Sequence, residues 1–424
     1  MSITLNTDHL KGFISDDEVK SILPAIKKAH EDLENKTGQG SDFLGWTDLP
    51  ARIEDSFIAE LEQLGKDVRA NSDCLVSIGI GGSYLGIRST IEFLRDAAQI
   101  PVYYAGHNMS VDYVHDLLET IKDKRVTVVV ISKSGTTTEP ALAFRLIKEA
   151  LKKKYNDEEL KQRIICVTDA NKGALRKTAD KEGYRSYVIP DDVGGRFSIL
   201  TPVGLVPLAI AGVDIKALVD GARQGQEEYA KMEMANNTCY QYVANRYLLY
   251  KKGKVIEVLS SFYDNMFYVN EWWKQLFGES EGKDGKGIFP ASLIMSTDLH
   301  SMGQLMQDGM RNVFETFIEI KKSKHSIAIP EDPEDVDSFN IIAGKDLDYV
   351  NKQAYKGTAS AHFEGGVPNM TFTLCQADAF HLGQLYYLFE RAVGLSGYLL
   401  EVNPFDQPGV EAYKKKMFAL LGKK

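Results

Sequence analysis

Residues 126–140 have the sequence VTVVVISKSGTTTEP, an unbroken apolar run that passes directly into hydroxyl-bearing side chains. A short run of this kind, rich in β-branched residues, is typical of a strand buried on both faces of a sheet. Similar runs occur at 74–78, 101–105, 163–168 and 186–189, and segments of helical spacing separate them near 84–97, 110–122, 139–154 and 170–182. Strands that alternate with helices predict a parallel sheet of right-handed βαβ crossovers over residues 70–215.

A second α/β unit is expected at residues 216–400. Its strand candidates are 255–259, 291–295, 313–320 and 370–374, and its helix candidates are 217–251, 264–277, 299–309 and 377–395. The polar stretch 323–368 is expected to be a surface loop with a short helix. Residues 1–69 are predicted to form a helical N-terminal segment. Residues 401–424 are predicted to hold a last helix, which begins near Pro408 and ends at Gly422.

Composition narrows the possible functions. The 424 residues include 50 Lys and Arg against 59 Asp and Glu, a formal net charge of −9. Such an acidic balance argues against a protein that binds nucleic acid or an anionic membrane surface. The sequence has neither an apolar run long enough to span a membrane nor a signal-peptide pattern, so we expect a cytoplasmic protein. The cysteines are expected to be reduced thiols, because none has a metal or redox spacing: Cys74, Cys166, Cys239 and Cys375.

Two loops are candidates for binding a phosphate group. The first, IGIGGSYLG at 78–86, is glycine-rich, but Tyr84 occupies the third glycine position of a dinucleotide fingerprint. The second places hydroxyl groups after a strand, at Ser132, Ser134, Thr136 and Thr137, with Thr138 expected to cap the following helix. Open α/β sheets bind ligands at the carboxyl ends of their strands. The pair of loops therefore predicts a site for a small phosphate monoester, although tight packing and ordinary capping remain alternatives.

Arginine and glutamate candidates occur outside these loops. Arg196 follows a Gly-Gly bend in DDVGGRFSILTPVG (191–204), where it could bind a ligand anion or pair with Asp191 or Asp192. Glu279 and Glu281 follow an apolar helix that is expected to end at Gly278. A carboxylate beside an apolar wall can act as a base, although many such glutamates are simply solvated.

Two basic candidates are expected on helices. His300 is predicted in the first turn of a helix capped by Thr297 or Asp298, where the helix dipole favours the neutral ring; a surface histidine is the alternative. Lys414 has apolar residues at −4, +3, +4 and +7, which predicts that it faces the protein interior. Lys415 is then expected to pair with Glu411.

With these motifs in place, the chain closely resembles the glucose-6-phosphate isomerase (phosphoglucose isomerase) family in its shorter bacterial type. The stretches DDVGGRFSILTPVG (191–204) and GYLLEVNPFDQPGVEAYK (397–414) carry most of the resemblance. The loops SIGIGGSYLG and ISKSGTTTEP are also typical of sugar isomerase (SIS) domains more widely. The resemblance implies an α/β fold of two SIS-like doubly wound domains and an aldose–ketose isomerase of glycolysis and gluconeogenesis that uses no metal or cofactor.

The resemblance also implies roles for individual residues. Glu279 corresponds to the base that moves a proton between C2 and C1, and Arg196 to the residue that stabilises the cis-enediol(ate). His300 and Lys414 correspond to groups that open the sugar ring, and Gln407 lies near the substrate. The phosphate is expected on Gly82, Ser83, Ser132, Lys133, Ser134 and Thr137, with Thr136 also in the substrate site. The family forms homodimers, in which the histidine comes from the partner subunit.

Two other functions remain possible from the sequence. A non-catalytic sugar-phosphate sensor would need only the hydroxyl-rich loops and would have no use for Glu279, His300 and Lys414 together. An isomerase for a related aldose phosphate, such as mannose 6-phosphate, would share both the base and the phosphate site.

Overall fold

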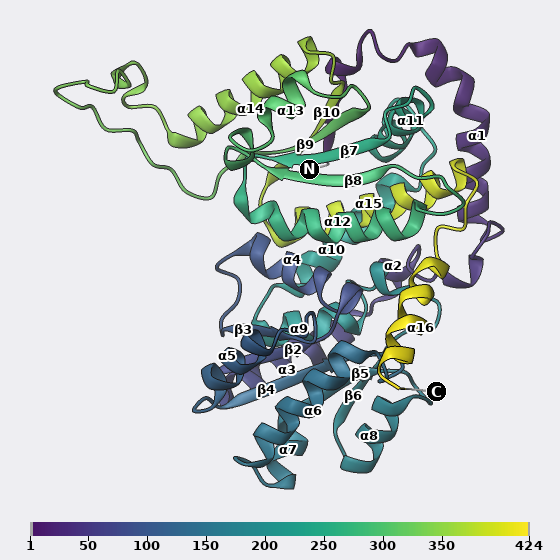
Figure 1. Cartoon of the computed structure of the whole chain (residues 1–424), viewed down its shortest axis with the longest axis vertical. Coiled ribbons are helices and arrows are strands. Elements are labelled where there is room, and N and C mark those ends of the chain that lie inside the picture. Colours follow the sequence, from purple (N-terminus) through teal and green to yellow (C-terminus); the bar gives the residue numbers. More distant parts are fainter. Residues whose placement is uncertain (1–2, 423–424) are drawn as a thin grey trace.

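The computed structural model describes residues 3–422, which form two five-stranded sheets, each covered by helices (Figure 1). The first sheet lies in the lower half of that view and the second in the upper half. Helices from several parts of the chain fill the layer between them, so the two halves share one main hydrophobic core.

The first sheet is entirely parallel and has the strand order β3-β2-β4-β5-β6. All five strands predicted between residues 70 and 215 are confirmed: β2 (Cys74–Ile78), β3 (Val102–Ala105), β4 (Val126–Ile131), β5 (Ile164–Thr168) and β6 (Arg185–Val188). Every residue of β2, β4 and β5 is buried, as their unbroken apolar sequences require.

Helices connect these strands at the expected places. They are α4 (Leu85–Leu94), α5 (Val111–Ile121), α6 (Thr138–Lys152) and α8 (Ala174–Glu182), with a further short α7 (Asp157–Arg163). From β2 the chain first adds β3 on one side and then returns to place β4 on the other. The carboxyl ends of β2 and β4 therefore form the topological switch point of the sheet, the usual ligand position in such folds.

The second sheet is also mainly parallel, with the strand order β1-β10-β9-β7-β8. The four predicted strands of this unit are confirmed as β7 (Ile256–Ser261), β8 (Phe289–Ile294), β9 (Val313–Lys322) and β10 (Asn369–Gln376). The segment 1–69, predicted as helical, holds α-helices and also a strand that was not predicted, β1 (Thr4–Asn6), which pairs antiparallel with β10. Three residues with no apolar periodicity carry too little pattern to be recognised as an edge strand.

Eight helices pack between and around the sheets. They are α1 (Asp16–Glu34), α2 (Leu49–Arg52), α3 (Asp55–Asn71), α9 (Pro202–Ala211), α10 (Ile215–Tyr229), α11 (Thr238–Lys251), α12 (Phe267–Glu281) and α15 (Ala379–Leu399). Helix α15 is buried along almost its whole length, against α10, α11 and α12. It therefore serves as the central core helix.

Four predicted helix ranges are wrong, and the first is 217–251, which is divided between α10 and α11 because Asn237 caps a new helix. The polar stretch 323–368 is predicted to hold only a short helix, but α14 (Leu347–Glu364) is 18 residues long. Only a narrow face of α14 packs on the sheet, at residues such as Ala359 and His362, so its sequence carries little apolar pattern. Helix α12 continues through Gly278 to Glu281, and α13 (Gly303–Asp308) is shorter than the predicted 299–309. Residues 323–346 form the arm that projects to the left in Figure 1.

Candidate active site

Arg196 lies on a 3₁₀ turn, Gly195–Phe197, and its side chain is only 2% exposed. Its Nε donates a hydrogen bond to Ser280 Oγ at 2.8 Å, and its Nη2 donates to the backbone carbonyl of Pro404 at 2.5 Å. Burial lowers the pKa of the guanidinium, and the nearby carboxylate of Glu279 opposes that shift. The turn thus holds a buried cation with one nitrogen, Nη1, left for other partners.

That remaining nitrogen brings two predicted site residues together. Arg196 Nη1 lies 3.4 Å from Glu279 Oε2 and 3.0 Å from Gln407 Oε1. The alternative pairing of Arg196 with Asp191 or Asp192 is wrong, since those acids pair with Lys133 and Arg52 instead. Segments more than 80 and 200 residues apart therefore converge on one guanidinium.

The structure separates Glu279 from Glu281, which the local sequence pattern left as two alternatives. The side chain of Glu281 is fully buried and forms an ion pair with Arg246, which also pairs with Glu257. The side chain of Glu279 is 34% exposed, and its Oε1 accepts a hydrogen bond from Gln275 at 3.2 Å. Helix α12 continues past Gly278 to Glu281, although a helical glycine costs about 1 kcal/mol.

The glycine-rich loop lies directly against the arginine turn. A Cβ atom added to Gly82 would be 1.8 Å from the carbonyl oxygen of Gly195, so only glycine allows the two backbones to approach this closely. A Cβ added to Gly81 would be 2.9 Å from Gln275 Nε2. Ser83 ends this same turn, Gly81–Ser83, so the loop, Arg196 and the end of α12 form one neighbourhood.

The hydroxyl-rich loop follows β4, at the switch point of the first sheet. Ser132 Oγ accepts a hydrogen bond from the amide of Gly135 at 3.0 Å, and Ser134 Oγ accepts one from the amide of Thr136 at 3.1 Å. Lys133 pairs with Asp191 at 2.8 Å. The N-cap of α6 is Thr137 and not Thr138 as predicted, because the chain enters the helix one residue earlier.

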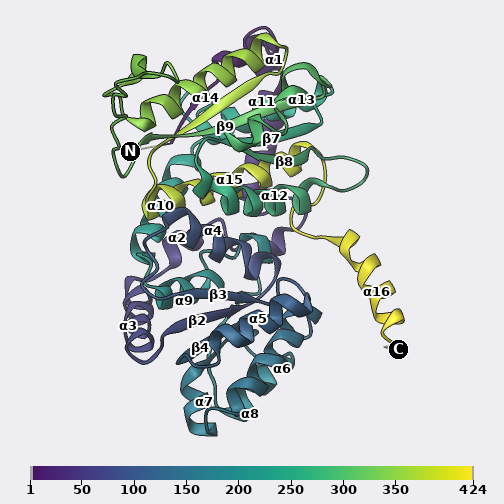
Figure 2. The same ribbon diagram turned by 60° about the vertical axis from the view of Figure 1, so that its left-hand side comes forward.

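Lys414 reaches this hydroxyl-rich loop. A hollow of about 210 Å³ is lined on one side by Ser134, Thr136, Thr137, Thr138 and Glu139 and on the other by Tyr413, Lys414, Met417 and Phe418. The prediction that Lys414 faces the interior is wrong: its side chain is 38% exposed, and it, and not Lys415, pairs with Glu411 at 2.7 Å. The reason is that its helix, α16 (Glu411–Leu420), lies at the periphery of the molecule (Figure 2).

His300 comes from another part of the chain, after β8. It is exposed and follows a 3₁₀ turn, Thr297–Leu299, so the prediction of a first helical turn is wrong. The carboxylate of Asp298 accepts hydrogen bonds from the Ile294 amide and the Ser301 hydroxyl, and it therefore does not cap a helix. Among residues 3–422, no interaction of the chain joins the His300 ring to Glu279 or Arg196.

Two residues of this neighbourhood were missed from the sequence. Gln275 precedes Glu279 by four residues and Lys283 follows it by four, and both contact it or its backbone. The spacing of four along a helix could have indicated Gln275. Lys283 could not be found in this way, because it lies beyond the expected end of the helix.

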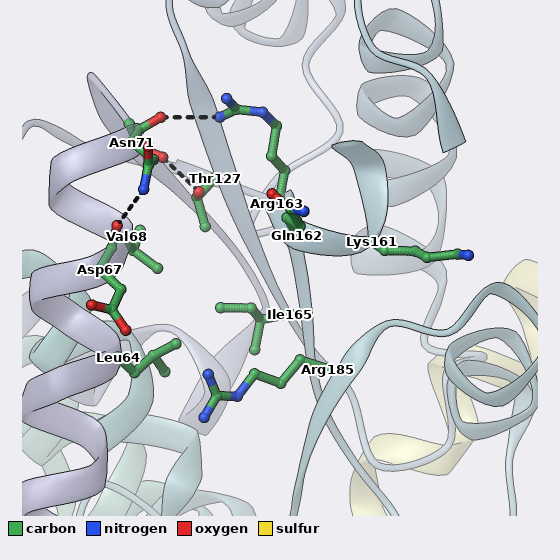
Figure 3. A pocket seen from close by; sticks show the side chains of 11 residues that line it. Leu64, Asp67, Val68, Asn71, Thr127, Lys161, Gln162, Arg163, Ile165 and Arg185 are labelled. Atoms are coloured by element: carbon green, nitrogen blue, oxygen red, sulfur yellow. Dashed lines mark hydrogen bonds between the residues drawn. The ribbon is translucent and has the colours of Figure 1, made fainter. Parts of the chain in front are cut away.

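A larger hollow, of about 410 Å³, lies at the opposite edge of the first sheet, where its strands begin (Figure 3). Helix α3 and the amino ends of β4, β5 and β6 enclose it, with Ser72 Oγ and Thr127 Oγ1 hydrogen-bonded at 2.7 Å. Arg163 donates to the backbone carbonyl of Asn71 there. This is the sheet edge opposite to the predicted loops, so the hollow is not part of the candidate active site.

Two further properties concern residues 3–422 as a whole. Within this range no three histidine, cysteine or acidic side chains gather closely enough to hold a metal ion. None of the helices in the same range combines the length and apolar character needed to cross a lipid bilayer.

Two mainly parallel α/β sheets with a polar site at their junction make up this architecture, which solved structures share. The fold is similar to that of a hypothetical protein from Thermus thermophilus, with a TM-score of 0.90 and 28% identity over 99% of both chains. It is also similar to that of a glucose-6-phosphate isomerase from Chlamydia trachomatis, with a TM-score of 0.82 and 18% identity over 96% of this chain and 86% of that one.

The family itself is shown by sequence. The profile described as "Phosphoglucose isomerase" matches residues 62–421. The chain is 52% identical over 432 aligned residues to a glucose-6-phosphate isomerase of Clostridium novyi, covering all of this chain and 96% of that protein. The chain therefore belongs to the phosphoglucose isomerase family.

Proposed function

We infer that this chain interconverts D-glucose 6-phosphate and D-fructose 6-phosphate, the aldose–ketose isomerisation named by its family. The observation that carries the inference is the placement of Glu279 Oε2 3.4 Å from a buried Arg196 guanidinium. Proton transfer next to a carbonyl group needs a base and a group that stabilises the resulting oxyanion, and Glu279 and Arg196 are our candidates for these two roles.

We propose that Glu279 takes the C2 proton of the open-chain aldose and returns it to C1. The electron pair of the C2–H bond forms the C1=C2 double bond, and the C1 carbonyl electrons move to O1, which becomes the oxyanion of the cis-enediol(ate). Transfer of the O2 hydroxyl proton to O1 and return of the abstracted proton to C1 then give the C2 ketone. Arg196 is placed to stabilise this oxyanion. A general base typically supplies roughly 10²–10⁴-fold in rate, and one well-placed donor to an oxyanion about 10²–10³-fold.

The substrate phosphate is assigned to the two loops at the switch point of the first sheet. Gly82 and Ser83 contribute from the first loop, and the second contributes Ser132, Lys133, Ser134, Thr136 and Thr137. Their hydroxyl groups and amides supply several donors with little net charge, since Asp191 already offsets Lys133. Binding energy from this remote group orients the carbon atoms at Glu279.

Ring opening is assigned to His300 and Lys414, with Gln407 next to the substrate. Lys414 shares a hollow with the hydroxyl-rich loop, and Gln407 accepts from Arg196. His300 is exposed, and no interaction within residues 3–422 joins its ring to Glu279, so we propose a homodimer in which the partner supplies it. The arm at 323–346 offers a surface for such contact, because it exposes Ile327, Val336, Phe339 and Ile341.

Two broader assignments accompany this function. We propose that the enzyme works in the cytoplasm, where glycolysis and gluconeogenesis take place. We also propose the division of the chain into an N-terminal segment (1–69), two SIS-like domains (70–215 and 216–400) and a C-terminal helical segment (401–424). The two parallel sheets support this division, each lying within one of the proposed domains apart from the edge strand β1.

The decisive test replaces Glu279 by glutamine. We expect Glu279→Gln to lower kcat by about 10²–10⁴-fold and to leave KM within a few-fold, because the phosphate contacts are unchanged. The matched control is Glu271→Gln on the same helix, whose carboxylate pairs with Lys274. A coupled assay for fructose 6-phosphate measures both variants. Turnover near the wild-type rate in Glu279→Gln would remove it from the role of base.

A further inference from the structure

Lys283 lies two residues beyond the end of α12, and its ammonium group is surrounded by backbone carbonyls. Its Nζ donates to the carbonyl oxygens of Glu279 at 2.9 Å, Ser280 at 2.9 Å and Asn403 at 2.5 Å. An ammonium has three hydrogens and no acceptor, so these three oxygens use all of its donors. The side chain is 9% exposed, so water competes little for these bonds.

A carboxylate and a second cation complete the surroundings. Asp406 Oδ1 lies 3.4 Å from Lys283 Nζ, and the backbone carbonyl of Asp406 accepts from Arg196 at 3.2 Å. Lys283 and Arg196 therefore bind the same turn, residues 403–407, from two directions. Burial lowers the pKa of Lys283 to about 8, and the charge of Arg196 acts in the same direction, while Asp406 and Glu279 oppose it.

We propose that Lys283 is a positioning residue for the isomerisation, joining the last turn of α12, which carries Glu279, to the 403–407 turn, which carries Gln407. The proposal rests on the role of Glu279 given above. The last carbonyls of a helix have no partners within the helix, so the last turn of α12, which carries Glu279, needs another donor to stay in place. Displacement of a reacting group by about 1 Å can cost on the order of 10²-fold in rate.

Lys286 provides a matched control, three residues further on. Its Nζ donates to the carbonyl of Leu400 at 2.9 Å and lies 3.8 Å from Glu401. Lys286 therefore also links the loop after α12 to a later part of the chain, but at residues 400–401. Its contacts reach neither the carbonyls of α12 nor the 403–407 turn.

The experiment compares Lys283→Met with Lys286→Met in steady-state isomerisation of glucose 6-phosphate. We expect kcat of Lys283→Met to fall by about 10–100-fold with KM changed less than about threefold, because the phosphate loops are untouched. Lys286→Met is expected to keep a near-normal kcat. If Lys283→Met does not fold, Lys283→Gln, with two amide hydrogens and a shorter reach, takes its place in the same comparison.

A double-mutant cycle distinguishes positioning from a general structural effect. If Lys283 acts through Glu279, adding Lys283→Met to Glu279→Gln should lower kcat by less than about twofold more. Losses that multiply would overturn the proposal, and so would a near-normal kcat in Lys283→Met. An active Glu279→Gln enzyme would instead refute the proposed role of Glu279 as the base. An inactive Glu279→Gln enzyme together with a fully active Lys283→Met enzyme would refute only the positioning role of Lys283.

Discussion

Glu279 and Glu281, two residues apart on one helix, have opposite environments. Glu281 is enclosed with Arg246, so its charge is neutralised inside the protein. Glu279 keeps one third of its surface exposed and faces Arg196 and Gln275. A fully paired buried carboxylate cannot take a proton from a ligand, whereas a partly exposed one beside a cation can. The surroundings, and not the residue type, therefore decide which glutamate is the candidate base.

The pKa of Lys283 leads to a prediction about stability. Burial and the Arg196 charge hold this pKa at about 8, against a usual 10.5, with Asp406 and Glu279 opposing. Between these values the unfolded chain binds more protons than the folded chain, so this group makes the free energy of unfolding rise with pH. The free energy of unfolding of the wild type is compared with that of Lys283→Met. We expect the difference, wild type minus variant, to increase by about 1 kcal/mol from about pH 7.5 to about pH 10, after allowance for solvent screening.

Urea unfolding of both proteins at the two pH values measures this difference. Because the methionine variant lacks the titrating group, the other groups of the chain largely cancel. A difference that stays constant or falls with pH would show that folding does not lower the pKa of Lys283.

At the scale of elements, α12 connects the two halves of the molecule. It packs on α4 of the first half and on β8 of the second, and its C-terminal turn lies beside the turns at 81–83 and 195–197. The candidate site is thus assembled where short turns of one half meet the end of a helix of the other. Small errors in this packing are expected to reach the chemistry directly.

Gly82→Ala tests that assembly. The added methyl group would lie 1.8 Å from the Gly195 carbonyl, so the two turns must separate. We expect unfolding free energy to fall by about 1–3 kcal/mol and kcat/KM to fall by at least about tenfold. The control is Gly357→Ala on α14, where an added Cβ meets nothing within 4 Å.

Alanine at position 357 is expected to leave activity unchanged and to stabilise the helix by about 0.4–1 kcal/mol. Thermal unfolding and the coupled assay report both quantities. Wild-type activity in Gly82→Ala would mean that the close approach of these two turns does not matter for catalysis.

At the scale of the whole molecule, the proposed dimer makes activity recoverable from two inactive chains. A hybrid of a Glu279→Gln chain and a His300→Ala chain has one site with both wild-type residues and one site with neither. We expect co-expression of the two to restore about one quarter of the wild-type activity, since about half of the dimers are hybrids with about half of their sites intact. Each variant alone serves as the control, and no recovery would place His300 in the site of its own chain.

The sequence alone determined the strands and the loops that follow them. Unbroken apolar runs such as 126–131 have no stable position except between two layers, and together with the less regular candidates they predicted nine strands of the two units. Hydroxyl groups directly after such a run must lie at the carboxyl edge of the sheet, and this placed Ser132 and Thr137 correctly. These inferences need only local pattern and the geometry of parallel sheets.

Only the tertiary structure decided which distant groups meet. The pairing of Arg196 with Glu279, the enclosure of Glu281 by Arg246 and the three carbonyls around Lys283 all join segments that no local pattern links. Helix ends were mispredicted for the same reason, since buried ion pairs and packing override the weak preferences of single residues such as Gly278. Local free-energy preferences fix strands and loops, whereas contacts between remote segments fix the site, because those contacts exist only after the chain has folded.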